Sequence, residues 1–97
     1  MPTIVQKYGG SSLADAEKVR GVARRVIDAK VKGVGVVVVC SAMGESTDEL
    51  LELSRQVASF PSGREVDLLL STGEMVSCAL LAMALNDMKC PAVSLTG

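Results

Sequence analysis

Apolar residues along this chain recur at two spacings, one typical of buried strands and one typical of amphipathic helices. Residues 34–40, VGVVVVC, form a run without polar residues, which predicts a strand buried on both faces of a parallel sheet. From Val19 to Ile27 the apolar positions follow the order i, i+3, i+4, i+7 and i+8, which predicts an amphipathic helix that Gly33 ends. Because residues 3–6 read as an earlier strand, this part is a βαβ unit, for which a right-handed crossover is expected.

The rest of the chain continues the alternation of strands and helices. Residues 47–58 have helical spacing of apolar positions, and FPSG at 60–63 breaks that helix. A short helix is predicted at 64–70, and a longer one at 72–87 that is apolar on nearly every side and therefore buried. Residues 92–95 read as a third strand. The order predicts an α/β fold with a parallel sheet, and three strands leave so much surface uncovered that we expect the front part of a larger domain.

Composition argues against several classes of function. The 97 residues suit at most one small domain, and a net charge of −1 with 2% aromatic residues gives no basis for nucleic-acid binding. Cys40, Cys78 and Cys90 lack C-x-x-C spacing and there is no histidine, so we expect no metal site and three reduced, mostly buried thiols. No leader segment and no apolar run near the ~18 residues of a membrane span is visible, which predicts a soluble, cytoplasmic chain without a membrane role.

The hexapeptide KYGGSS, Lys7 to Ser12, follows the first predicted strand and combines a cation, two glycines and two hydroxyls. Glycines at the end of a strand allow backbone N–H groups to approach phosphate oxygens, and a following helix adds partial positive charge at its N-terminus. A Gly-Gly pair beside a lysine is more often an ordinary turn, so this motif needs support from elsewhere in the chain.

Each predicted strand ends in a small polar motif: KYGGSS, then SAMGEST at 41–47, then SLTG at 94–97. Ligands of open α/β sheets bind in the crevice beyond the carboxyl ends of the strands, so three such loops would line one site. The alternative is that their Gly, Ser and Thr residues serve only as turn and cap residues, which is usual for βα connections. Both interpretations are consistent with these motifs.

Capping boxes offer a structural explanation for several of the same residues. The pattern S/T-x-x-D/E occurs at Ser12 with Asp15, Ser46 with Glu49, Ser62 with Glu65, and Ser71 with Glu74. A capping box stabilises a helix start by about 1 kcal/mol, and for Ser62 that explanation suffices. Glu74 differs, because a carboxylate amid apolar helix is costly to bury without a cationic partner such as Lys7 or a ligand ammonium.

Common nucleotide-binding motifs and catalytic triads are absent from the sequence. Neither G-x-x-x-x-G-K-[ST] nor G-x-G-x-x-G occurs, which argues against a P-loop NTPase and a dinucleotide-binding domain. Without histidine there is no Ser-His-Asp or Cys-His arrangement. Phosphoryl transfer to a carboxylate stays open, because a carboxylate with a pKa of about 4 is already deprotonated at neutral pH and needs no general base.

Four segments carry a family resemblance: VQKYGGSSLAD, VVVVCSAMGESTDELL, REVDLLLSTGEMVSCALLAMAL and VSLTG. In this order and at these separations they closely resemble the beginning of the aspartokinase family, within the amino-acid-kinase superfamily, and the resemblance covers essentially the whole chain. It implies phosphoryl transfer from MgATP to the β-carboxylate of L-aspartate, giving β-aspartyl phosphate, the first step of lysine, threonine and methionine synthesis. It also implies a three-layer α/β sandwich with a mainly parallel sheet, incomplete in this chain.

The resemblance implies roles for individual residues as well. Lys7 would be catalytic, neutralising charge on the transferring phosphoryl group, and Glu74 would pair with the α-ammonium of aspartate. Mg²⁺ would be held through the ATP phosphates and not by a metal site on this chain. The residues involved would be Lys7, Tyr8, Gly9, Gly10 and Ser41 around the nucleotide, with Thr47 and Glu74 around aspartate.

Aspartokinases are several times longer than this chain. Residues 1–97 would be the N-terminal portion of the catalytic domain, without its second half, which carries an essential aspartate and the adenine contacts, and without a regulatory ACT domain. We therefore expect these residues to be inactive alone, to need the remainder of the catalytic domain and to work within an oligomer. Two alternatives stay open: another amino-acid kinase, for example one acting on glutamate, and a non-catalytic fragment that binds phosphate or assembles with a partner.

Overall fold

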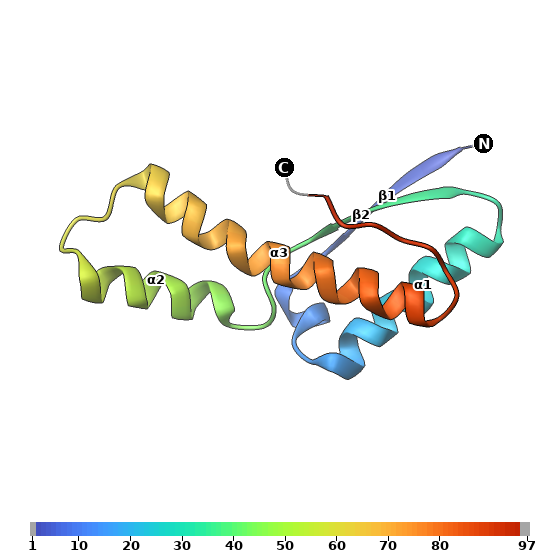
Figure 1. The fold of residues 1–97 in the computed structure, drawn as a ribbon, viewed down its shortest axis with the longest axis horizontal. Helices are drawn as coiled ribbons and strands as arrows, with labels where there is room; N and C mark the ends of the chain where they lie inside the picture. The colour runs from blue at the N-terminus through green and yellow to red at the C-terminus, as the bar shows by residue number, and fades with distance from the viewer. Residues whose placement is uncertain (1, 96–97) are drawn as a thin grey trace.

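The computed structural model describes residues 2–95, in which a two-stranded sheet is combined with three α-helices (Figure 1). In chain order the elements are β1 (Thr3–Tyr8), the 3-10 turn η1 (Gly10–Leu13), α1 (Ala16–Val31), β2 (Gly35–Cys40), α2 (Ser46–Val57) and α3 (Gly63–Asp87). The predicted strand, helix, strand order and the predicted helix that follows it are confirmed. α2 and α3 form a hairpin that extends away from the sheet, so the molecule is elongated, 50 × 26 × 17 Å.

β1 and β2 pair in parallel over their whole length, from Thr3 opposite Gly35 to Tyr8 opposite Cys40. A parallel pair needs a crossover connection, and α1 supplies it. As predicted, the helix ends before Gly33, which has a positive φ of 86° that favours glycine. Both strands therefore end at the same edge of the sheet, where the KYGGSS and SAMGEST segments begin.

The hydrophobic core lies between one face of the sheet and the helices α1 and α3. α1 contributes the apolar stripe predicted from its spacing, and β2 contributes Val36 and Val38 from the sheet side. The buried members of this core are Leu13, Val19, Val22, Ala23, Val26, Cys40, Leu81 and Leu85. This aliphatic packing confirms an α/β fold with a parallel sheet.

The opposite face of the sheet is uncovered in the part of the chain that the structure describes. Val37 is 51% exposed, Val39 44% and Val5 65%. The prediction that β2 is buried on both faces is therefore wrong for these residues, because α1 and α3 pack on the same face. An apolar face left open in this way is what a sandwich shows when only one covering layer is in place.

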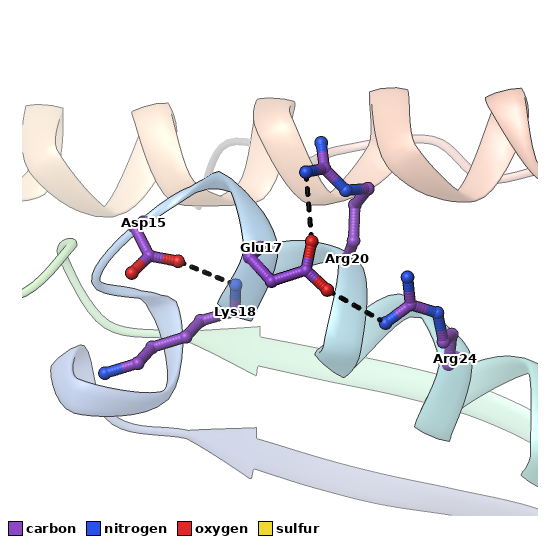
Figure 2. A network of polar contacts seen from close by, with 5 residues as sticks. All are labelled: Asp15, Glu17, Lys18, Arg20 and Arg24. Atoms are coloured by element: carbon purple, nitrogen blue, oxygen red, sulfur yellow. Dashed lines mark hydrogen bonds and ion pairs between the residues drawn. The ribbon is translucent and has the colours of Figure 1, made fainter.

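α1 begins at Asp15, whose carboxylate accepts a hydrogen bond of 2.8 Å from the Lys18 backbone N–H (Figure 2). Beside this cap, Glu17 accepts hydrogen bonds from the guanidinium groups of Arg20 at 3.1 Å and Arg24 at 3.4 Å. The hydrogen bonds from Arg20 and then Arg24 hold the pKa of the Glu17 carboxyl below its usual value. Because these side chains are exposed, the network contributes little to stability.

Of the two capping boxes predicted near the starts of α1 and α3, only the one at Ser62 caps its helix. Ser62 accepts a hydrogen bond of 3.3 Å from the Glu65 backbone N–H, which confirms the cap of α3. Ser12 instead lies within η1, so the predicted cap at Ser12 is wrong and Asp15 itself caps α1.

α3 is one continuous helix of 25 residues and not the two helices predicted. Ser71 and Thr72 lie in its interior, where their hydroxyls donate to the carbonyls of Leu68 and Leu69 at 2.7 Å. Because their hydroxyls are hydrogen-bonded within the helix, Ser71 and Thr72 continue α3 and do not begin a second helix. The expectation that this helix is buried is also wrong in this structure, since Met83, for example, is 63% exposed.

By length and composition alone, α3 could cross a membrane, which differs from the expectation that no segment approaches that length. The core helices of soluble proteins pass the same test. In this structure α3 buries a stripe of Ser77, Leu81 and Leu85 against the sheet and α1, which is how a core helix packs.

The end of α3 is a tight turn that directs the chain back along the sheet (Figure 1). Lys89 has a left-handed φ of 67°, and the Cys90 N–H donates to the Leu85 carbonyl at 2.9 Å. This geometry is a Schellman motif, in which a lysine stands where glycine is usual.

The predicted third strand at 92–95 is wrong, because these residues are irregular in the structure. The side-chain amide of Asn86 forms two hydrogen bonds with the backbone of Ala92, its carbonyl oxygen accepting at 2.8 Å and its NH₂ donating at 3.2 Å. The backbone groups of Ala92 that could join a neighbouring strand are thus taken by a side chain. Thr96 and Gly97, the end of the SLTG motif, lie outside the described residues.

Candidate active site

The loops that follow β1 and β2 are hydrogen-bonded to each other. The Ser41 backbone N–H donates to the Tyr8 carbonyl at 3.0 Å, and the Gly44 N–H donates to the Gly10 carbonyl at 2.9 Å. KYGGSS and SAMGEST therefore lie side by side at the carboxyl edge of the sheet, as expected for the first two predicted loops.

The two glycines of KYGGSS have different surroundings. A Cβ atom on Gly10 would lie 2.9 Å from the Gly44 carbonyl oxygen and 3.0 Å from that of Ala42, too close for any side chain. Gly10 is thus required by the contact between the two loops. A Cβ atom on Gly9 would meet nothing within 4 Å, so packing does not require glycine there, and the residue is exposed.

Lys7 is exposed on the uncovered face of the sheet. Its cross-strand neighbour is Val39, and the alternation of strand residues puts both side chains on the face opposite α1 and α3. In residues 2–95 the Lys7 ammonium forms no ion pair. Among residues 2–95, Lys7 is therefore an unpaired cation near the carboxyl edge of the sheet, where the KYGGSS loop begins.

Tyr8 lies on the other face of β1, toward α1. Its hydroxyl donates to the Gln6 side-chain oxygen at 2.8 Å, and the Arg25 guanidinium lies 6.0 Å from the centre of its ring. The contact with Arg25 was not apparent from the sequence, because it joins a strand to a helix residue far along the chain. Tyr8 is therefore held by side chains of the βα unit, which is consistent with a role in shaping the loop.

Two contacts hold α3 against the end of β2. A Cβ atom on Gly73 would lie 2.9 Å from the Cβ of Ala42, so the helix backbone touches the SAMGEST segment there. About one turn later, Cys78 packs against the core that includes Cys40, the last residue of β2. The STGE segment of α3 is thereby packed against the loop that also contacts KYGGSS.

Glu74 and Ser41 come from these adjoining segments, since Glu74 follows Gly73 and Ser41 precedes Ala42. Glu74 is exposed and has no ion pair among residues 2–95, so the expected cost of burying its carboxylate does not arise in this structure. Its predicted capping role is wrong, because Ser71 lies inside α3 and not at a helix start. Helix capping thus gives no structural reason for a carboxylate at this position.

Burial raises the pKa of the Cys40 thiol to about 12, and the adjacent Cys78 thiol adds to the shift. Cys40 is therefore neutral at pH 7. All three cysteines are free, as predicted, but only Cys40 is buried, whereas Cys78 and Cys90 are partly exposed.

Thr47 lies in the first turn of α2 and is exposed. This turn has no side-chain cap, so the predicted capping box of Ser46 with Glu49 is not formed. A groove of about 250 Å³ runs between this turn and α3, and residues of both, including Ser46 and Thr72, line it. The SAMGEST and STGE segments thus share a groove near Thr47.

Comparison with known proteins identifies the family of the chain. The profile of the amino acid kinase family matches residues 2–97. The chain belongs to the amino acid kinase family. It is similar to the aspartokinases of Mycolicibacterium smegmatis, at 55% identity, and Geobacillus stearothermophilus, at 57%, over all 97 residues, which make up 23% and 24% of those proteins. The structure matches that of aspartate kinase from Synechocystis with a TM-score of 0.93 and 49% identity, over 96% of this chain and 16% of that one.

The chain spans about a quarter of the length of the curated relatives it matches. Variants are therefore best tested in a chimera in which residues 1–97 replace the matching segment of the Geobacillus stearothermophilus relative. The identity of 57% over this segment gives the replaced part a closely similar set of neighbours.

The contact between α3 and the SAMGEST loop predicts that Gly73→Ala destabilises the chimera by about 1–3 kcal/mol, through overpacking against Ala42. Combining Gly73→Ala with Ala42→Gly removes the Cβ atom with which the new methyl group clashes. The double variant should therefore regain much of the lost free energy of unfolding. Urea unfolding of both single variants and the double variant measures this coupling.

Gly21→Ala in α1 is the matched control, because a Cβ atom at Gly21 would meet nothing within 4 Å. Because alanine has a higher helix propensity than glycine, Gly21→Ala should stabilise the chimera by about 0.5–1 kcal/mol. If Gly73→Ala stabilised by the same amount, or if Ala42→Gly gave no rescue, the close contact of α3 with the loop would be refuted.

Proposed function

We propose that this chain forms part of a catalytic domain that transfers the γ-phosphoryl group of ATP to the β-carboxylate of L-aspartate, giving β-aspartyl phosphate. The observation that carries the proposal is the meeting of KYGGSS, SAMGEST and STGE at one edge of the parallel sheet, the edge at which open α/β sheets bind ligands. Similarity over all 97 residues to proteins named aspartokinase supports aspartate as the acceptor.

Transfer to a carboxylate requires positioning and neutralisation of charge and no general base. In the proposal, the Lys7 ammonium neutralises charge on the transferring phosphoryl group. The open backbone at Gly9 and the hydroxyl of Ser41 contribute hydrogen-bond donors for the phosphates. Thr47 and Glu74 hold aspartate, for which a carboxylate suits the α-ammonium.

Two further residues of the nucleotide-binding set act indirectly in this proposal. Gly10 keeps the KYGGSS loop in contact with the loop after β2, and Tyr8 anchors the same loop toward α1. Both therefore determine where the donors of the loop stand in relation to the phosphates.

Mg²⁺ enters the proposal as the ion that accompanies ATP. No group of three or more His, Cys, Asp or Glu side chains in residues 2–95 is arranged to hold a metal ion. Magnesium ions bind substrate phosphates readily and usually keep several waters, so binding through the nucleotide fits these residues. Bound there, the ion would offset negative charge on the phosphate oxygens.

The experiment is to assay the chimera with ATP and Mg²⁺, with L-aspartate or L-glutamate as acceptor, and to trap the acyl phosphate with hydroxylamine. We expect ATP-dependent aspartyl hydroxamate and a kcat/KM for aspartate about 10- to 200-fold above that for glutamate, since one methylene in a binding pocket is worth about that much. Preference for glutamate would favour the other amino-acid kinase. A folded chimera without activity toward either acceptor, beside an active unmodified relative, would favour a non-catalytic role.

The two glycines of KYGGSS should respond differently to alanine. Gly9→Ala has room for its Cβ atom and should leave stability nearly unchanged while raising the KM for ATP, because the methyl group obstructs approach to the backbone. Gly10→Ala should destabilise the chimera by about 1–3 kcal/mol, since the added Cβ atom would clash with two carbonyl oxygens. Urea unfolding and ATP saturation curves of the chimera separate the two effects. An unchanged KM in Gly9→Ala would remove that backbone from the phosphate site.

The proposal places the protein in the cytoplasm, at the first step of lysine, threonine and methionine synthesis. It also requires the remainder of the catalytic domain, and it includes an oligomeric assembly. Size-exclusion chromatography of the chimera with light scattering tests the last point.

A further inference from the structure

We propose that Arg25 is a positioning residue for nucleotide binding, and that it acts through the ring of Tyr8 on the KYGGSS loop. This inference rests on the proposed function, because there the loop binds the phosphates of ATP. Arg25 itself lies in the middle of α1 and has no assigned contact with either substrate. Its effect on the loop is measured through the affinity for ATP, which needs no phosphoryl transfer.

Arg25 is the arginine of α1 whose guanidinium lies against β1. The other two arginines of this helix both donate to Glu17 (Figure 2). Arg25 follows Val22 by three residues, and Val22 is only 1% exposed, so Arg25 begins beside the buried stripe of the helix. Its guanidinium lies over the Tyr8 ring, 6.0 Å from the centre, and forms no ion pair among residues 2–95.

Tyr8 connects Arg25 to the loop, because each part of the residue has a partner of its own. The hydroxyl donates to the Gln6 side chain at 2.8 Å, and the ring packs against the hydrophobic core. The backbone carbonyl accepts a hydrogen bond of 3.0 Å from the Ser41 N–H. Tyr8 is also the last residue of β1, so its position determines how the chain enters the loop at Gly9. A contact that holds the ring therefore holds the start of the loop.

Lys7 depends on the same contact, because successive residues of a strand point to opposite faces. A rotation of the end of β1 about its own axis would move the Lys7 ammonium and the Gly9 N–H together. The face that carries Lys7 is uncovered in residues 2–95. In this part of the chain the restraint on such a rotation comes from the Tyr8 side, where Arg25 contributes to it.

The expected size of the effect follows from the strength of a contact between a cation and an aromatic ring. At exposed sites it amounts to about a 2- to 5-fold change in an equilibrium constant, which corresponds to about 0.5–1 kcal/mol. Losing the contact lowers the population of the loop position that binds ATP, and the apparent Kd rises by up to the same factor. The KM for aspartate should change less, because Thr47 and Glu74 belong to α2 and α3.

The experiment measures the Kd of the chimera for MgATP by isothermal titration calorimetry, together with the KM for each substrate. Arg25→Gln should raise the Kd and the KM for MgATP about 2- to 5-fold. Arg25→Lys keeps a cation for the ring and should bind MgATP nearly as tightly as the unmodified chimera. Arg24→Gln is the matched control, because it removes the same charge from a side chain that pairs with Glu17, and its Kd should not change.

A second set of variants tests whether the ring of Tyr8 carries the effect. Tyr8→Phe keeps the ring, so adding Arg25→Gln to it should still weaken MgATP binding about 2- to 5-fold. Tyr8→Leu removes the ring, so adding Arg25→Gln to it should cause no further change. If Tyr8→Leu does not fold, Tyr8→Met, which also lacks a ring, takes its place.

Three results would overturn the inference: an unchanged Kd in Arg25→Gln, an equal rise in Arg24→Gln, or an effect of Arg25→Gln that persists without the ring. A chimera that binds MgATP but phosphorylates neither acceptor would contradict the proposed function alone, since the Kd values still decide the role of Arg25. A chimera that does not bind MgATP, beside an unmodified relative that does, would contradict both.

Discussion

Lys7→Ala in the chimera is expected to lower kcat by about a thousandfold. An ammonium about 4 Å from a phosphate charge contributes on the order of 4 kcal/mol at an effective dielectric constant of 20, which corresponds to about that factor in rate. The KM for aspartate should change far less, because the proposed contact of Lys7 is with the phosphoryl group. Steady-state kinetics with both substrates varied measure the two effects separately.

Lys18→Ala is the matched control for Lys7→Ala, because it removes the same charge from an exposed side chain on α1. Its kcat should equal that of the unmodified chimera. Both variants should unfold at the same temperature, since Lys7 is exposed and forms no ion pair within residues 2–95. Unchanged turnover in Lys7→Ala would remove Lys7 from the mechanism.

Glu74→Gln is expected to raise the KM for aspartate by about 10- to 100-fold while lowering kcat much less. A hydrogen bond to a charged group is worth about 1.5–3 kcal/mol, and the amide keeps the shape of the side chain while losing its charge. The expectation that stability is retained follows from the structure, in which Glu74 is exposed and takes no part in a helix cap. Saturation curves for aspartate at fixed MgATP measure the shift.

Glu65→Gln provides the comparison for Glu74→Gln on the same helix. Glu65 lies in the first turn of α3, where its carboxylate pairs with Arg64 at 2.6 Å, away from the STGE segment. The KM of the Glu65→Gln chimera for aspartate should not change. If Glu74→Gln instead lowered the unfolding temperature and left the kinetics untouched, Glu74 would be a structural residue.

The strands and helices were predictable wherever the hydrophobic pattern is local and strong. The apolar run at 34–40 and the helical spacing from Val19 became β2 and α1, and their parallel pairing brings KYGGSS beside SAMGEST as expected. Predictions failed where a side chain could complete the hydrogen bonding in two ways. Ser71 reads as a helix cap but bonds back within α3, and Ala92 pairs with Asn86 in place of a strand.

The sequence by itself determined the βαβ unit, the α2 helix and the polar motifs after the strands, because periodicity and turn chemistry act between residues close in the chain. Only the tertiary structure decided that Lys7 faces the uncovered side of the sheet. It alone also decided that Gly10 and Gly73 are required by contacts with the SAMGEST loop and that Cys40 and Cys78 pack in the same core. These features depend on how closely distant segments approach one another, and the local pattern of residues carries no information about that distance.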